Sequence, residues 1–136
     1  MKPKILMIEN SAYDMEVYAE LLRDQYDLTF AWSIVQASEM QMVYFDLIIL
    51  DVMMPPEDLF GLAETEKGLL TGLCFFDKFL KGKFVPIIFM TAATGAVLAK
   101  IEEHRRKFPQ ILAVMRKADM NPIDFKHAID EWARDR

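Results

Sequence analysis

The sequence predicts a single α/β domain, in which a parallel sheet is covered by helices on both faces. Five short apolar runs alternate with helical patterns along the 136 residues, and this alternation is typical of right-handed strand–helix–strand crossovers. The run Leu47–Leu50 is entirely apolar, as expected for a strand that is buried on both faces. A chain of this length buries one core, so residues 1–136 are expected to form one domain.

The first half of the chain contains three of the expected strands. Lys4–Ile8 is the first strand, and Ala12–Gln25 follows as a helix, because its apolar residues recur at three- and four-residue spacing. Leu28–Trp32 is rich in β-formers, and Ile34–Val43 has a weaker helical pattern. Leu47–Leu50 is the third strand.

The second half adds two strands and the remaining helices. Val85–Met90 and Ile111–Met115 are short β-rich apolar runs, which we interpret as the fourth and fifth strands. Val97–Phe108 is expected to be a helix that Pro109 ends. Asn121 before a proline is a helix-start signal, so the chain is expected to end in a helix.

The segment Glu57–Lys83 begins polar and ends with a helical pattern. Its apolar stripe consists of Leu69, Leu73, Phe76 and Leu80. Gly72 lies within this stripe, where a glycine costs about 1 kcal/mol relative to alanine. The start of the helix is poorly defined, because the residues before it fit either a loop or an extra turn.

Composition and charge exclude several classes of protein. The net charge of −5 argues against a nucleic-acid-binding surface and favours protein partners. No apolar run approaches the roughly 20 residues that span a bilayer, and the amino terminus lacks the pattern of a signal peptide. We therefore expect a cytoplasmic protein with no membrane contact.

Polar residues follow four of the expected strands directly. Glu9 and Asn10 follow the first strand, Asp51 the third, Thr91 the fourth and Lys117 comes just after the fifth. In open α/β sheets, ligands bind outside the carboxyl ends of the strands. Carboxylate and amide oxygens suit Mg²⁺, while a hydroxyl and an ammonium suit phosphoryl oxygens. Each residue also has a purely structural interpretation as a helix cap, a turn residue or a solvated side chain.

The chain resembles the receiver domains of bacterial two-component response regulators along nearly its whole length. The resemblance is carried by KILMIEN, DLIILDVMMP, VPIIFMTA and the lysine of VMRK. It implies a flavodoxin-like strand order, which the apolar pattern alone leaves open. It also implies that Asp51 is a phosphoacceptor supplied by a histidine kinase or a phosphotransfer protein, rather than the nucleophile of an enzyme with turnover.

The resemblance also implies roles for the residues around Asp51. Glu9 and Asn10 match the pair that binds Mg²⁺ together with Asp51, and Met53 matches the residue whose backbone carbonyl completes the metal site. Thr91 and Lys117 match the phosphoryl-binding hydroxyl and lysine. Positive charge would lower the repulsion between a carboxylate and a phosphoryl group, which supports these roles physically.

Four features depart from the family pattern. Asn10 stands where the family has a second acid, so Mg²⁺ binding is expected to be weakened. Ala118 replaces the proline that usually follows the lysine, and Val114 replaces a common aromatic residue. The chain between Val52 and Met90 is longer than usual, with the surplus expected between Glu57 and Gly72, close to the site.

These observations lead to one principal hypothesis and three alternatives. The first is a stand-alone receiver domain that signals through contact with a separate effector protein and that can form a homodimer. The second is a degenerate receiver that binds a partner without phosphorylation. The third is a hydrolase with an aspartate nucleophile, which would need a second acid where Met53 stands. The fourth is a flavin protein, which would need a phosphate-binding loop after the first strand, and this loop is absent.

Overall fold

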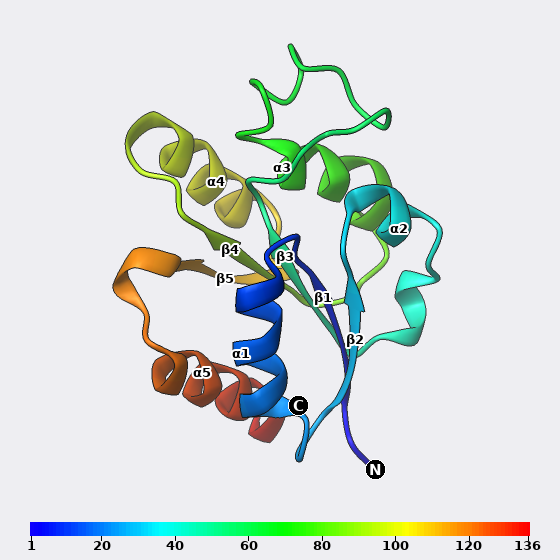
Figure 1. The fold of residues 1–136 in the computed structure, drawn as a ribbon, viewed down its shortest axis with the longest axis vertical. Coiled ribbons are helices and arrows are strands. Elements are labelled where there is room, and N and C mark those ends of the chain that lie inside the picture. The colour runs from blue at the N-terminus through cyan, green and yellow to red at the C-terminus, as the bar shows by residue number, and fades with distance from the viewer.

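The computed structural model describes residues 1–136 and contains one five-stranded parallel sheet (Figure 1). The strand order is β2-β1-β3-β4-β5, which confirms the flavodoxin-like arrangement. The strands are β1 Lys4–Ile8, β2 Asp27–Ala31, β3 Leu47–Asp51, β4 Ile87–Thr91 and β5 Ile111–Arg116. Because all strands are parallel, their carboxyl ends meet at one edge of the sheet.

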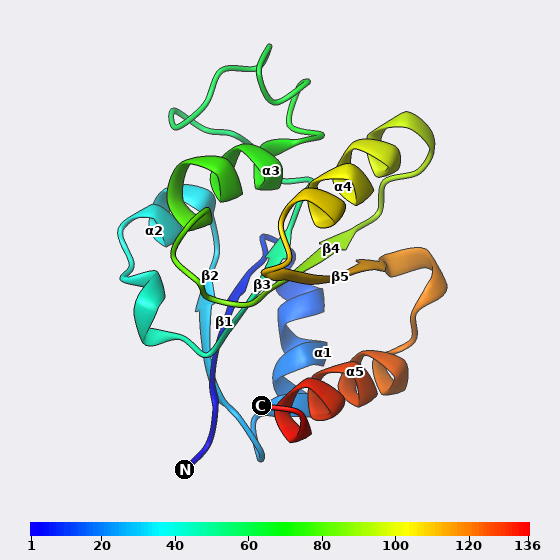
Figure 2. The same cartoon turned by 180° about the vertical axis from the view of Figure 1, so that it is seen from behind.

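Helices cover both faces of the sheet, as predicted. In Figures 1 and 2, α1 and α5 lie on one face, and α2, α3 and α4 lie on the other. The helices are α1 Ala12–Leu22, α2 Ile34–Ser38, α3 Thr71–Phe75, α4 Gly95–Lys107 and α5 Pro122–Arg134. The short helical turns are η1 Met42–Tyr44, η2 Phe76–Leu80 and η3 Lys117–Asp119. None of these helices has the length and apolar character needed to cross a membrane.

Most element boundaries lie within two residues of the prediction, and larger or informative differences occur in α1, α2 and β4. The first helix ends at Leu22 rather than Gln25, and α2 ends at Ser38 instead of continuing to Val43. The Ser38 hydroxyl donates to the Val35 carbonyl at 2.6 Å, a local bond that competes with continuation of the helix. Strand β4 begins at Ile87, because Pro86 before it has no N–H to donate to a neighbouring strand.

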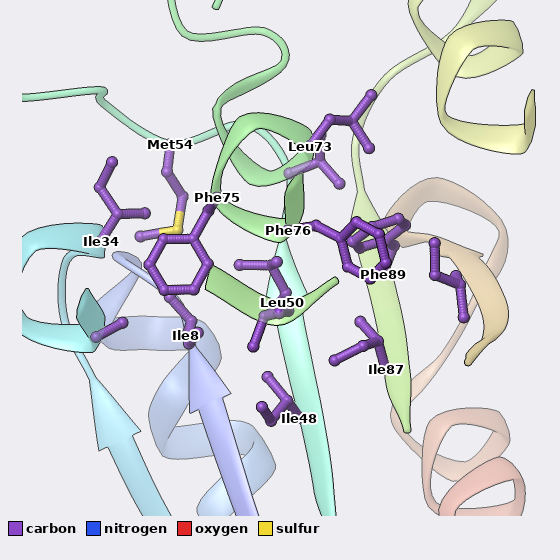
Figure 3. Close-up of a cluster of buried hydrophobic side chains, with 14 of the residues drawn as sticks. Ile8, Ile34, Ile48, Leu50, Met54, Leu73, Phe75, Phe76, Ile87 and Phe89 are labelled. Atoms are coloured by element: carbon purple, nitrogen blue, oxygen red, sulfur yellow. The ribbon is translucent and has the colours of Figure 1, made fainter. Parts of the chain in front are cut away.

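The larger of two hydrophobic clusters packs between the sheet and α2, α3 and α4. Figure 3 shows Phe75 and Phe76 directed toward side chains of the central strands, including Leu50 and Phe89. The rings of Phe76 and Phe89 meet edge to face, with their centroids 6.0 Å apart. The second cluster holds α1 and α5 against the opposite face. Asp51 therefore lies at the end of a strand that is packed on both sides.

Gly72 is required by the fold rather than merely tolerated in it. Its amide donates to the Val52 carbonyl at 2.9 Å, which brings the start of α3 against the end of β3. A Cβ atom at Gly72 would lie 2.6 Å from the Val52 Cα atom. Glycine is thus the residue that permits this close backbone approach, and the small helix-propensity penalty expected from the sequence is outweighed.

The segment from Val52 to Leu70 forms turns without a regular helix and stands out above α3 in Figure 1. Thr65 is fully buried within it, and its hydroxyl donates to the Gly61 carbonyl at 3.0 Å and accepts from the Gly68 amide at 3.1 Å. The segment therefore has internal packing of its own. The predicted helical stripe is correct from Leu73 onward and wrong at Leu69, which is exposed in a turn.

Candidate functional site

Asp51 and Glu9 are buried carboxylic acids at the carboxyl edge of the sheet. Asp51 is the last residue of β3 and pairs in register with Met90 of β4. Glu9 follows β1, and its backbone amide donates to the Ala31 carbonyl at the end of β2. Only 5% of the Asp51 surface and 2% of the Glu9 surface are exposed. Acids are rarely buried to this extent without a charged partner.

Lys117 is the charged partner of both acids. It begins η3 directly after β5, and its side chain is 23% exposed. The Nζ atom lies 3.0 Å from Glu9 Oε2, 3.2 Å from Asp51 Oδ2 and 3.2 Å from Asp14 Oδ2. One ammonium group thus joins two carboxylates from the β1–α1 region and one from the end of β3.

The burial of these charges changes their proton affinities. Burial and the nearby charge of Glu9 raise the pKa of Asp51 to about 7, although Lys117 opposes the shift. Burial lowers the pKa of Lys117, but the charges of Asp51 and Glu9 outweigh burial and leave this pKa above its ordinary value. Lys117 is therefore protonated at neutral pH, where Asp51 titrates.

Thr91 and Met53 lie beside these charged groups. Thr91 ends β4 next to β3 and is fully buried, and its hydroxyl accepts a hydrogen bond from the Ala93 amide at 2.9 Å. The Met53 amide donates to Asp51 Oδ1 at 3.2 Å. The Met53 backbone is therefore next to the acceptor carboxylate, while no hydrogen bond joins Thr91 to Asp51.

Asn10 is exposed, and its side chain makes no hydrogen bond in the structure. The third carboxylate at Lys117 instead belongs to Asp14, in the first turn of α1. Sequence reasoning missed Asp14, because this residue lies within a helix and not at the end of a strand. The signal that could have found it is its place in the first turn of the helix that follows Glu9.

The oxygen donors at this edge fit the chemistry that Mg²⁺ prefers. Carboxylate oxygens of Glu9 and Asp51 converge on one point, which is the position of a cation, the Lys117 ammonium. No three histidine, cysteine or acidic side chains are arranged as a ready-made metal cluster. A divalent ion would thus share the carboxylates with Lys117 rather than enter a preformed cage.

Two other positions that depart from the receiver pattern, Ala118 and Val114, lie in η3 and β5. Ala118 is exposed in η3, and every peptide bond in the chain is trans. Val114 is half-buried in β5 and packs against the larger hydrophobic cluster. A branched aliphatic side chain therefore occupies the position at which an aromatic residue is common in the family.

Comparison with solved structures identifies the fold. The non-phosphorylated HemR receiver domain of Leptospira biflexa is similar to this chain, with a TM-score of 0.64 and 24% identity over 96% of this chain and 93% of that one. A CheY-like receiver domain of Methanospirillum hungatei gives a TM-score of 0.71 and 16% identity, over 99% and 96% of the two chains. This chain has the receiver-domain fold.

A third receiver domain, from a putative LuxO repressor protein of Vibrio parahaemolyticus, has a TM-score of 0.69 and 19% identity, over 96% of this chain and 88% of that one. No family model and no curated protein matches the sequence. Within the receiver fold, Glu9, Asp51, Thr91 and Lys117 stand at the carboxyl edge of the sheet, and Asn10 is exposed. Their roles in phosphoryl chemistry stay predictions.

Proposed function

We propose that this protein is a response regulator of two-component signalling that accepts a phosphoryl group on Asp51. The observation that carries the proposal is the buried Asp51 carboxylate, which contacts a protonated lysine at 3.2 Å. The donor would be the phosphohistidine of a sensor histidine kinase or of a phosphotransfer protein. The phosphorylated form would then be recognised by a separate effector protein.

The transfer requires Asp51 to act as a nucleophile. One carboxylate oxygen forms a bond to phosphorus while the phosphorus–nitrogen bond of the phosphohistidine breaks, and the bonding electrons return to the imidazole. Lys117 is within reach of the phosphoryl oxygens, because its ammonium already touches Asp51. A positioned positive charge of this kind stabilises the charge of the transferred group.

The neighbouring residues would hold the phosphoryl group and the metal. The Thr91 hydroxyl can donate to a phosphoryl oxygen, since its only recorded hydrogen bond uses it as an acceptor. Glu9, Asp51 and the Met53 carbonyl would hold Mg²⁺, with the neutral amide of Asn10 contributing less than an acid would. When bound, Mg²⁺ supplies positive charge that offsets the repulsion between the carboxylate and the incoming phosphoryl oxygens.

Incubation with acetyl phosphate and Mg²⁺, followed by intact-mass measurement, tests the proposal. We expect the mass of one phosphoryl group to be added to the wild-type protein and not to Asp51→Asn. The exposed Asp24 provides a matched control, so Asp24→Asn is expected to be modified like the wild type. A wild-type mass that stays unchanged would contradict the proposal.

A second candidate function is contact with a partner regardless of phosphorylation. It is favoured by an apolar groove of about 850 Å³, which lies between α5 and the side of the sheet formed by β4 and β5. The groove extends to the edge of the sheet opposite Asp51. Phe84 lines this groove and is 90% exposed. The apolar residues that line it include Val43, Phe45, Phe84, Leu112, Met115 and Trp132. Exposed apolar patches of this kind commonly mark interaction surfaces.

The occupant proposed for this groove is a second copy of the chain. Its rim carries charges of both signs, from Lys83 and Arg136 and from Glu131 and Asp135, so opposite charges of two copies can pair across it. Sedimentation velocity would then detect a dimer that acetyl phosphate leaves unchanged and that Phe84→Ser dissociates. A wild-type monomer at all concentrations would rule this function out.

A further inference from the structure

One carboxylate at the site does not come from the position that the family pattern indicates. That pattern places two acids after β1, but here the second position holds the neutral Asn10. Glu9, Asp51 and Lys117 together carry a formal charge of −1. A site with so little negative charge attracts a divalent cation weakly, because affinity for such ions depends on the number of charged ligands.

Asp14 adds the missing negative charge at the same point in space. Its Oδ2 atom lies 3.2 Å from Lys117 Nζ, as close as that of Asp51. With Asp14 included, the four side chains carry a formal charge of −2, which equals that of a site with two acids after β1. Asp14 and Lys117 also line a hollow of about 270 Å³ between α1 and the start of α5, so both side chains are open to solvent.

The local structure fixes Asp14 in this position. Ser11 caps α1, and its hydroxyl accepts from the Asp14 amide at 3.2 Å. An acid in the first turn of a helix often interacts only with the helix dipole. Asp14 differs, because the one recorded partner of its carboxylate is a lysine 103 residues away in the chain.

We propose that Asp14, through its contact with Lys117, supplies the second negative charge beside the divalent-cation pocket and compensates for the amide at position 10. It acts by sharing Lys117, so that the lysine charge does not fall on Glu9 and Asp51 alone. This inference rests on the proposed Mg²⁺-dependent function and extends it to a residue outside the family pattern. The acid that the family pattern places at position 10, directly after β1, is then replaced by an acid at position 14, in the first turn of α1.

Calorimetric Mg²⁺ titration of four proteins tests this inference. Asp14→Asn is expected to weaken Mg²⁺ binding by about tenfold relative to the wild type, the scale observed when a residue that supports a metal ligand is lost. The double variant Asn10→Asp with Asp14→Asn is expected to recover most of the affinity. Asp24→Asn removes an exposed acid far from Lys117, so it is expected to bind like the wild type.

The outcomes separate this inference from the proposed function. If the wild type binds Mg²⁺ and Asp14→Asn binds it equally well, Asp14 is not part of the pocket, although the proposed function stands. If binding weakens and Asn10→Asp does not restore it, Asp14 has only a structural role and the inference is wrong. A wild type that binds no Mg²⁺ overturns both. Thermal melting of each variant, without Mg²⁺, verifies that it is folded.

Discussion

The site is held together by one side chain, that of Lys117. Its ammonium contacts Glu9, Asp14 and Asp51 within 3.2 Å, and two of these acids are almost fully buried. Ionised carboxylates at such short separation repel one another strongly in a poorly solvated site. The lysine therefore stabilises the resting protein by the same contacts that make it available to a phosphoryl group.

Replacement of Lys117 by glutamine is expected to destabilise the protein by about 3 kcal/mol, because it leaves buried carboxylates without a counter-charge. Mg²⁺ should then raise the melting temperature of Lys117→Gln more than that of the wild type, since a bound cation replaces the lost charge. Thermal unfolding with and without Mg²⁺ measures both effects. Lys107→Gln, which removes an exposed pair with Glu103, is expected to leave the melting temperature unchanged. Equal responses of Lys117→Gln and the wild type to Mg²⁺ would contradict this explanation.

At the scale of single residues, the sequence predicted which strand ends carry polar side chains, and it did not predict their contacts. Strand periodicity locates Asp51 and Thr91 because a side chain at a strand end is fixed by the strand itself. Asp14 lies on a helix, and its partner is distant in the chain. Only the packing of α1 beside the β5–α5 connection brings Asp14 and Lys117 together, and no local pattern encodes that distance.

At the scale of elements, the junction between β3 and α3 determines how the chain leaves the site. The two elements approach so closely that the backbone at Gly72 touches Val52. Helix η2, which continues α3, contains five residues with π-type geometry, and Phe76 and Leu80 within it are fully buried. The long turn segment before α3 is therefore anchored at its end by a tightly packed helix.

Gly72→Ala is expected to destabilise the protein by about 3 kcal/mol, because its methyl group would overlap the backbone at Val52. Urea unfolding of the variant measures this loss. Gly61→Ala is the matched control, since nothing lies within 4 Å of a Cβ atom there. It should change stability by less than about 0.5 kcal/mol. Similar losses in the two variants would show that close approach is not the cause.

The contact between α5 and the connection from α1 to β2 depends on pH through Asp130. The Tyr26 hydroxyl and the Lys126 ammonium each contact its carboxylate at 2.5 Å. Burial acts to raise the pKa of Asp130, but these two hydrogen bonds outweigh it and the pKa is lowered. The folded state thus binds a proton less readily than the unfolded chain, so stability from Asp130 is present at neutral pH and is lost in acid.

Asp130→Asn is therefore expected to be less stable than the wild type at neutral pH and to approach it below about pH 4, the ordinary range of an aspartate. Urea unfolding of both proteins at several pH values measures the difference. Asp24→Asn has no such partners and should follow the wild-type curve throughout. A difference between Asp130→Asn and the wild type that is constant with pH would contradict the assigned ion pair.

At the scale of the whole molecule, the alternation of apolar runs and helical patterns was sufficient to predict the fold class. The strand order came from the resemblance, because apolar runs do not specify which strands are neighbours. The segment from Val52 to Leu70 was not predictable, since its conformation depends on single contacts such as those of the buried Thr65. Backbone torsions with positive φ at Glu57, Glu66 and Lys67 also follow no simple sequence signal.

The fold separates the acceptor site from the apolar groove. Asp51 ends β3, whereas the groove is formed around the opposite ends of the central strands and along α5. Phosphorylation and self-association can therefore be measured independently, by mass and by sedimentation. The identity of Asp51 as the acceptor is the central claim, on which the roles of Glu9, Thr91 and Lys117 depend.

Chemical mapping of the phosphorylated residue tests that claim most directly. After acetyl phosphate treatment with Mg²⁺, borohydride reduces an aspartyl phosphate to homoserine, and peptide mass spectrometry locates the product. We predict homoserine at position 51 alone, in the peptide that contains the end of β3. Homoserine at another aspartate, an acid-stable phosphate on a hydroxyl side chain, or no modification at all would contradict the proposed function.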